Sequence, residues 1–138
     1  MGGVQEPKKL METNTIKILR MDHHSVLSSD LAKSKFFYHD ILGLEIDQNR
    51  PTFKYDGAWF KIGEQAIHCI CLPNPDPILE RPEHGGRDRH VALRIANLQP
   101  LITKLEEHDI FYSKSKSGRA AIFFRDPDGN AVEVIEED

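Results

Sequence analysis

Four side chains that can bind a metal ion stand at matched positions in the two halves of this 138-residue sequence. They are three imidazoles and one carboxylate, from His23, His68, His90 and Glu133. His68 follows His23 by 45 positions, and Glu133 follows His90 by 43 positions. Such a set suits Zn²⁺, Ni²⁺, Mn²⁺ or Fe²⁺, which imidazole and carboxylate groups bind. The two intervals are what a duplicated unit with one ligand on each outer strand would require.

Each of these residues also has a simpler interpretation. A single histidine on a strand is more often a hydrogen-bonded structural group, and Glu133 lies in the acidic run EVIEED, whose carboxylates are usually solvated. His39, His84 and His108 fall on a polar helix stretch, in a proline-rich segment and at a helix end, so we expect no function for them. From the residues alone, a metal site and a set of structural side chains are both open.

Strand alternation supports the metal site. Successive side chains of a strand point to opposite faces, so the residues two along from each candidate share its face. The residues expected to line the same cavity are Ser25, Ala92, Arg94 and Ile135. The residues between them are apolar and expected to face the helices, namely Val91, Leu93, Val132 and Val134. In the pair His23-His24, a one-residue change of register would exchange the imidazole that faces the cavity.

These residues lie on a pattern of strands and helices that occurs twice. The first half predicts, in order, a strand at 16–27, a helix at 31–42 and strands at 44–47, 52–60 and 66–72. The second half predicts a strand at 90–95, a helix from Leu98 to Leu105 and strands at 110–113, 120–125 and 130–135. A shift of 67 positions carries His23 onto His90 and Leu31 onto Leu98. We therefore expect an α+β fold of paired βαβββ modules.

The chain has room for one domain. We expect a flexible leader at 1–14 and a single domain at 15–138, made of a module at 15–72, a linker at 73–89 and a module at 90–138. The linker is predicted from its four prolines and its Gly-Gly pair. Residues 1–14 lack the apolar stretch of a signal peptide.

Composition narrows the function classes. The net charge of −4 disfavours a nucleic-acid or anionic-membrane surface, and no run approaches the length of a membrane span. Only Cys69 and Cys71 are present. Two cysteines so close together on one strand form a disulfide with difficulty and fall short of a zinc ribbon, so we expect reduced thiols in a cytoplasmic protein.

Three stretches carry a resemblance to a known family. MDHHSVLSSDLAKSKFFYHDILGLE resembles the opening of glyoxalase/bleomycin-resistance/dioxygenase proteins, also called the vicinal oxygen chelate superfamily. RHVALRI resembles the family's fifth strand, and FFRDPDGNAVEVIE resembles its closing strand with a ligand glutamate. The likeness covers roughly residues 16 to 136. It implies a cup-shaped mixed sheet with helices on the outer face and a divalent metal at its centre.

Carried over residue by residue, His23, His90 and Glu133 match the family's two-histidine, one-glutamate set. His68 departs from it, because glyoxalase I enzymes of similar length usually have glutamate there. His24 is a second departure, since a small apolar residue is usual at that position. A neutral fourth ligand would make the metal more Lewis-acidic and leave Glu133 as the only ligand carboxylate able to act as a base.

The resemblance implies a glyoxalase-type isomerase or lyase, in which metal chelation of two neighbouring oxygens accompanies proton transfer. Glu133 is the expected base, and glutathione or another thiol is an expected cosubstrate. The expected substrate-binding residues are Ser25, Phe60, Arg94 and Arg119. Arg94 or Arg119 would bind a cosubstrate carboxylate, although a solvated loop charge is the simpler interpretation of Arg119. Relatives with two modules often share sites across a homodimer, so we expect one.

Three alternatives are open. A fosfomycin-type thiol transferase would use the same triad, with Lys114, Lys116 and Arg119 facing a phosphonate, yet the chain ends five residues past Glu133. An extradiol dioxygenase would need Fe²⁺ with open positions, which His68 would crowd. A bleomycin-binding type of module would be non-catalytic, but such relatives generally lack the ligands.

Overall fold

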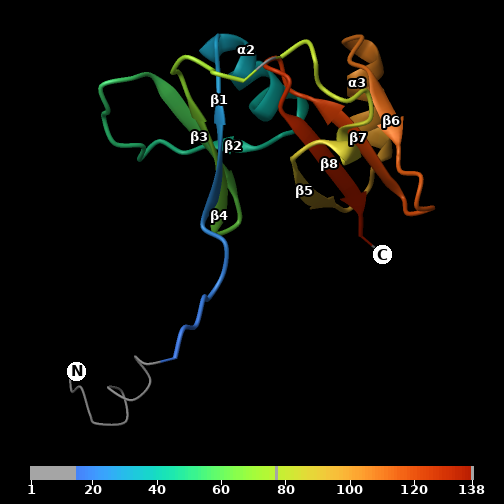
Figure 1. The fold of residues 1–138 in the computed structure, drawn as a ribbon, viewed down its shortest axis with the longest axis horizontal. Coiled ribbons are helices and arrows are strands. Elements are labelled where there is room, and N and C mark those ends of the chain that lie inside the picture. Colours follow the sequence, from blue (N-terminus) through green and yellow to red (C-terminus); the bar gives the residue numbers. More distant parts are fainter. Residues whose placement is uncertain (1–14, 77, 138) are drawn as a thin grey trace.

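The computed structural model describes residues 15–76 and 78–137, so the leader predicted at 1–14 lies outside the described residues. Figure 1 shows two sheets beside each other with a helical segment between them. The elements of the first half are β1 (His23–Leu27), α2 (Leu31–Lys35), the π-helix η1 (Phe36–Ile41), β2 (Glu45–Ile46), β3 (Gly57–Ile62) and β4 (Gln65–Ile70). Those of the second half are η2 (Gly85–Arg87), β5 (His90–Ile95), α3 (Gln99–Glu107), β6 (Tyr112–Lys114), β7 (Ala121–Arg125) and β8 (Ala131–Glu136).

The two sheets have the same topology. The strand orders are β1-β4-β3-β2 and β5-β8-β7-β6, and in each sheet the first pair is parallel and the others antiparallel. A helical segment follows the first strand of each module. The predicted α+β fold of paired βαβββ modules is therefore confirmed, and one chain supplies two separate four-stranded sheets.

The first strand is shorter than predicted. It begins at His23 rather than at residue 16, and Ile16, Ile18 and Leu19 are 91%, 88% and 73% exposed. His23 pairs with Ala66, close to the turn where β4 begins, so β4 has almost no chain left to pair with earlier residues. An apolar pattern can predict an extended segment, but a strand also needs a partner for its backbone groups.

The predicted first helix forms, capped by Asp30, whose side chain accepts a hydrogen bond from the Lys33 amide at 3.2 Å. Its second half is a π-helix, and the Leu42 amide donates to the Phe37 carbonyl at 3.0 Å. Gly43 follows with φ +75°, as expected of a residue just past a helix end. The wider turn of a π-helix changes the direction of successive side chains. In η1, Phe37 packs on the second module and Tyr38 on the first.

Phe37 and Tyr38 of η1 join the two sheets into one core. The Phe37 ring lies 5.7 Å from Phe124 of β7, and the Tyr38 ring lies 5.3 Å from Phe60 of β3. The Tyr38 hydroxyl donates to Asp126 at 2.7 Å, across 88 positions of sequence. Burial raises the pKa of Asp126, and its hydrogen bonds to Asn130 and Tyr38 oppose that rise. The modules are thus packed through a buried, hydrogen-bonded contact.

The segment predicted as a linker is held to the second sheet by ion pairs. Asp88 accepts from Arg81 at 3.1 Å and from Arg125 of β7 at 2.9 Å. The segment contains the short helix η2, whose Gly85 is buried against Ala131 and Phe123. These contacts position the chain just before His90. Within the part of the chain that the structure describes, no helix is both long and apolar enough to cross a bilayer.

Candidate functional site

Two of the four candidate ligands lie together on the first sheet. Ser25 of β1 and Trp59 of β3 both pair with His68 of β4, so these three side chains share one face with His23. We call this the first site face; it is defined by His23, Ser25, Trp59 and His68. The opposite face, with Val26, Phe60 and Ile67, is buried in the core.

His68 lies between two other rings on the first site face. Its centroid is 3.9 Å from that of His23, with 14° between the ring planes, and 4.1 Å from that of Trp59, with 6° between them. Burial lowers the pKa of His68, and the charge of protonated His23 lowers it further. Both effects favour the uncharged form of the ring, which lies flat against its neighbours.

This stacking limits how His23 and His68 can bind one ion. A metal ion lies in the plane of each imidazole that binds it, about 2.1 Å from the nitrogen. Planes only 14° from parallel, in rings 3.9 Å apart, do not meet within that distance. One of the two rings must rotate before both can hold the same ion.

The outer nitrogen of His23 is occupied by a carboxylate. Its Nδ1 lies 2.8 Å from Asp22 Oδ2, and this hydrogen bond is the main cause that lowers the pKa of Asp22. A carboxylate on Nδ1 fixes the tautomer and leaves Nε2 as the free acceptor. His23 thus has the arrangement common among metal-binding histidines.

The other two candidates lie together on the second sheet. Glu133 of β8 pairs with Ala92 of β5 and with Phe123 of β7, which places it on the face that carries His90. We call this the second site face; it is defined by His90, Ala92, Phe123 and Glu133. The opposite face carries Val132 and Val134, which are buried as predicted.

His90 and Glu133 are spaced like two ligands of one ion. His90 Nε2 lies 3.3 Å from Glu133 Oε1, and the Glu133 side chain is only 5% exposed. Two ligand atoms about 2.1 Å from an ion, at a tetrahedral angle, are about 3.4 Å apart. His90 Nδ1 donates to the Asp88 carbonyl at 2.9 Å, which directs Nε2 toward the carboxylate. This pair therefore fits a divalent cation.

Arg119 binds the second oxygen of the same carboxylate. Its guanidinium donates to Glu133 Oε2 at 2.7 Å, and its side chain is 54% exposed. Arg119 is therefore more than a solvated loop charge. Arg94 lies on β5 two positions beyond Ala92 and is exposed on the same face, opposite Ile135 in the register.

Phe60 needs a correction. It is 0% exposed and packs on Tyr38, on the side of β3 away from His68. The residue of β3 on the first site face is its neighbour Trp59, which the sequence analysis missed. The short turn between Ile62 and Gln65 was the usable signal, because a hairpin register counted from that pair puts Trp59 opposite His68.

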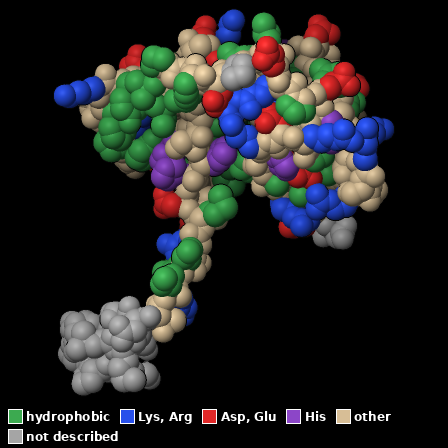
Figure 2. All heavy atoms as spheres, viewed as in Figure 1, with side chains coloured by type: hydrophobic (Ala, Val, Ile, Leu, Met, Phe, Trp, Pro, Cys, Tyr) green, Lys and Arg blue, Asp and Glu red, His purple; other side chains and the backbone are tan. Residues whose placement is uncertain are grey.

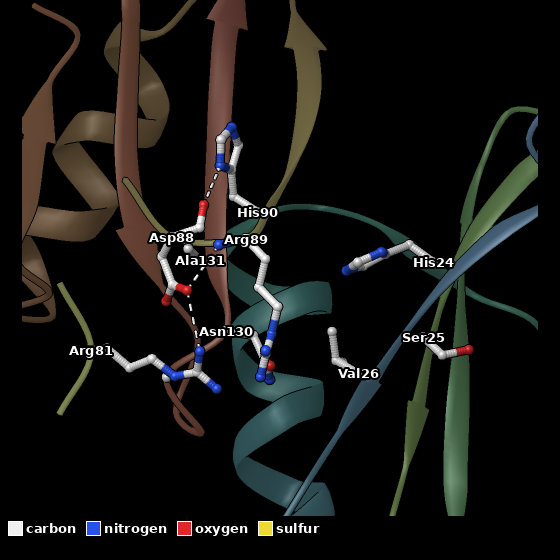
Figure 3. A pocket seen from close by; sticks show the side chains of 10 residues that line it. His24, Ser25, Val26, Arg81, Asp88, Arg89, His90, Asn130 and Ala131 are labelled. Atoms are coloured by element: carbon white, nitrogen blue, oxygen red, sulfur yellow. Dashed lines mark hydrogen bonds and ion pairs between the residues drawn. The ribbon is translucent and has the colours of Figure 1, made fainter. Parts of the chain in front are cut away.

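The structure separates the two imidazoles of the His23-His24 pair. Figure 3 shows His24 pointing into a pocket between the modules while Ser25 points away from it. This pocket, with a volume of about 180 Å³, is lined by His24, Val26, Arg81, Arg89, His90 and Asn130, among others. Burial lowers the pKa of His24, and Asp126 opposes that shift. His23, on the other face of β1, is the one beside His68.

The comparison with protein families covers almost the whole described chain. The model of the Glyoxalase/Bleomycin resistance protein/Dioxygenase superfamily matches residues 20–134. The chain belongs to this superfamily. The family match and the two βαβββ modules agree, since the sheet topology repeats within the matched residues.

Several superfamily members are similar along most of their length. The chain is 27% identical to the Arabidopsis thaliana protein named Glyoxylase I 4 (88% of this chain, 72% of that protein). It is 30% identical to the uncharacterized protein YaeR of Escherichia coli strain K12 (86% and 98%) and 29% identical to the glutathione transferase FosA of Serratia marcescens (83% and 78%).

Two solved structures share the fold. A glyoxalase family protein from Bacillus anthracis superposes with a TM-score of 0.70 at 22% identity, covering 89% of this chain and 98% of that one. A point mutant of the fosfomycin resistance protein FosX from Listeria monocytogenes, complexed with Mn(II) and dihydroxypropylphosphonic acid, superposes with a TM-score of 0.69 at 18% identity, covering 88% and 95%. At these identities, the superpositions establish the fold alone.

This superfamily member carries its candidate ligands as two separate pairs. His23 and His68 are on the first site face, and His90 and Glu133 are on the second. Among residues 15–76 and 78–137, no three histidine, cysteine or acidic side chains come close enough to share a metal ion. A complete set of four therefore needs the two site faces of different copies, or a rearrangement of one chain.

Proposed function

We propose that this protein is a divalent-metal-dependent isomerase or lyase of glyoxalase type, acting on a small oxygenated substrate. The observation that carries the proposal is the His90–Glu133 pair. Its 3.3 Å spacing, the nearly complete burial of the carboxylate and the hydrogen bond from His90 Nδ1 to the Asp88 carbonyl support a cation held between these two side chains.

We propose that the metal is held by His90 and Glu133 of one copy together with His23 of a second copy, in a homodimer. β1 and β5 are edge strands of their sheets, and each pairs on one side only within the described residues. An open edge that carries apolar and site residues favours pairing with another chain. Twofold symmetry would then form two equivalent sites. His68 is the fourth candidate, once the ring of His23 or His68 rotates.

A bound divalent ion would supply Lewis acidity toward two neighbouring substrate oxygens. Glu133 is our candidate for the group that takes a proton from the substrate carbon beside the carbonyl and returns it to the neighbouring carbon. Arg119 holds Oε2 of this carboxylate, so Oε1 is the oxygen directed at His90. Arg94 is exposed on the same face, where it could bind a carboxylate of a thiol cosubstrate such as glutathione.

A second candidate function is thiol transfer to an antibiotic of the fosfomycin type. Arg119 lies at the second site face beside Glu133, next to a loop that also carries Lys116, so positive charge is available for a phosphonate. The sequence similarity to the glutathione transferase FosA supports this candidate. Both reactions would use His23, His90 and Glu133, so only turnover distinguishes them.

The first experiment is metal analysis followed by assays. We expect about one divalent ion per chain after purification with Ni²⁺, Zn²⁺, Mn²⁺ or Fe²⁺ present. A protein that rejects all four ions would refute the proposal. The loaded protein is then tested with methylglyoxal plus glutathione, fosfomycin plus a thiol, and a catechol. Turnover of the first supports the glyoxalase type, and tight ligand binding without any turnover would instead indicate a binding module.

A mixing experiment tests whether the site is shared between copies. His23→Ala and His90→Ala variants each lack one ligand in every site, but a mixed dimer of the two has one intact site. Random re-pairing should restore about a quarter of the wild-type metal sites if ligands come from both subunits. If all ligands came from one chain, mixing would restore none. Sedimentation of each variant checks that dimers still form.

A further inference from the structure

The loop between β2 and β3 is built onto the first site face by Arg50. The Arg50 guanidinium donates to the Tyr55 carbonyl at 3.1 Å and lies 4.8 Å over the centre of the Phe53 ring. Gly57 makes room for it, since a Cβ there would lie 2.9 Å from the guanidinium and 2.3 Å from the Cys69 carbonyl. The loop conformation is therefore specified by named contacts.

The loop brings two further rings, those of Phe53 and Tyr55, next to Trp59 of β3. Phe53 is stacked on Tyr55 with centroids 5.3 Å apart and 11° between the planes, and its centroid is 6.3 Å from that of Trp59. Trp59 in turn stacks on His68. We call Phe53, Tyr55 and Trp59 the aromatic wall. Figure 2 shows the hydrophobic patch over this loop, and Phe53 is 40% exposed there.

A cavity lies against the aromatic wall and reaches the candidate metal ligands. Its volume is about 350 Å³, and it is lined by the aromatic wall together with His23, Ser25, Arg50 and His68, among others. Pockets for small molecules have walls of aromatic side chains and a few polar groups that orient the ligand. Asp22 and Arg50 also line this cavity and carry charge, while on the second site face the buried Glu133 carboxylate is paired with Arg119.

We propose that the aromatic wall binds a flat aromatic or unsaturated group of the substrate, beside the two oxygens that the metal would chelate. This inference rests on the proposed function and adds the substrate class. Ring faces and edges attract a planar group more strongly than a methyl group at the same position. His68, stacked on Trp59, forms the inner end of the subsite.

The test uses mandelate and lactate, which have the same 2-hydroxy acid group and differ by a phenyl in place of a methyl. Calorimetry on the Zn²⁺-loaded wild-type protein should show mandelate binding about tenfold more tightly than lactate. Trp59 is the only tryptophan of the chain, so mandelate should also change the intrinsic fluorescence. Equal affinities for the two acids would overturn the proposal.

Phe53→Leu and Trp59→Leu should each reduce the preference for mandelate to about threefold or less, because each removes a ring of the wall. Phe36→Leu is the matched control, since Phe36 is 41% exposed but lies on η1 against His108. It should keep the full preference. If Trp59→Leu does not fold, Phe53→Leu decides. An unchanged preference in every folded wall variant would refute the subsite.

The same titrations separate this inference from the proposed function. Suppose that mandelate binds with the same affinity with and without Zn²⁺ and still changes the Trp59 fluorescence. That result would support the aromatic subsite and contradict the metal-dependent function. If both acids bind only with Zn²⁺ and equally well, the metal site holds and the aromatic subsite fails.

Discussion

The two modules have the same topology but different site faces. The first presents a stack of rings, in which His68 lies between His23 and Trp59. The second presents charge, with the buried carboxylate of Glu133 between His90 and Arg119. The repeated backbone thus carries candidate ligands at matching positions, but the side chains around them differ. We infer that one face is suited to hold a cation and the other to hold a ring.

The largest effect expected from this difference is on metal binding. Glu133→Gln should weaken the affinity for Zn²⁺ by more than about 100-fold, because even the loss of a residue that only orients a ligand commonly costs tenfold or more. His68→Gln should weaken it by less than about tenfold. Calorimetric titration measures both, and His39→Gln on the exposed side of η1 is the control. If Glu133→Gln and His68→Gln lowered the affinity for Zn²⁺ equally, His68 would contribute to metal binding as much as Glu133 does.

The buried contact between the modules should carry the next largest effect. Tyr38→Phe removes the hydrogen bond to Asp126, and a lost bond to a charged partner lowers the free energy of unfolding by about 1.5–3 kcal/mol. Urea unfolding followed by Trp59 fluorescence and by circular dichroism should show one shared transition.

Tyr112→Phe is the control for this variant, since its hydroxyl donates to Glu106 at the surface. It should change the stability by less than about 0.5 kcal/mol. Two separate transitions in the wild-type protein would show that the modules unfold independently, contrary to a shared core.

Arg119 should stabilise the second site face mainly when no metal is bound. Arg119→Gln leaves the buried Glu133 carboxylate without its guanidinium and should lower the free energy of unfolding by about 1 kcal/mol in the presence of a chelator. Saturating Zn²⁺ should remove most of this difference in stability between the variant and the wild-type protein, because the cation replaces the lost positive charge. Lys116→Gln is the control on the same loop. If Zn²⁺ left the stability difference between Arg119→Gln and wild type unchanged, Arg119 would not belong to the cation site.

The smallest effect concerns the thiols on and after β4. Burial raises the pKa of Cys69 to about 12, so its thiolate forms only as the pH approaches that value. A disulfide reagent at pH 8 should therefore modify Cys71 first, and Cys69 should react only after unfolding. Raising the pH toward 12 should increase the rate at Cys69. Equal rates at pH 8 would mean that the core face of β4 opens readily.

Much of the fold and part of the site could be predicted from local pattern. The alternation of side chains along β8 correctly predicted that Val132 and Val134 face the core. This alternation is a local property of an extended chain, so it can be predicted from sequence. The same rule failed at Phe60. The strand was expected to begin five residues too early, and its pairing register with the next strand was not predicted. The contact between Tyr38 and Asp126 had no local signal, since it joins residues 88 positions apart.

By itself, the sequence determined the order of the two βαβββ modules and the residue types at the four candidate ligand positions. Both follow from periodicity, spacing and side-chain chemistry, which act over short stretches of chain. Only the tertiary structure decided that the candidates form two pairs and that Trp59 stacks on His68. It also decided that His23, rather than His24, lies beside His68. Those outcomes depend on strand register and on how η1 packs the two sheets, which are long-range interactions that no local pattern contains.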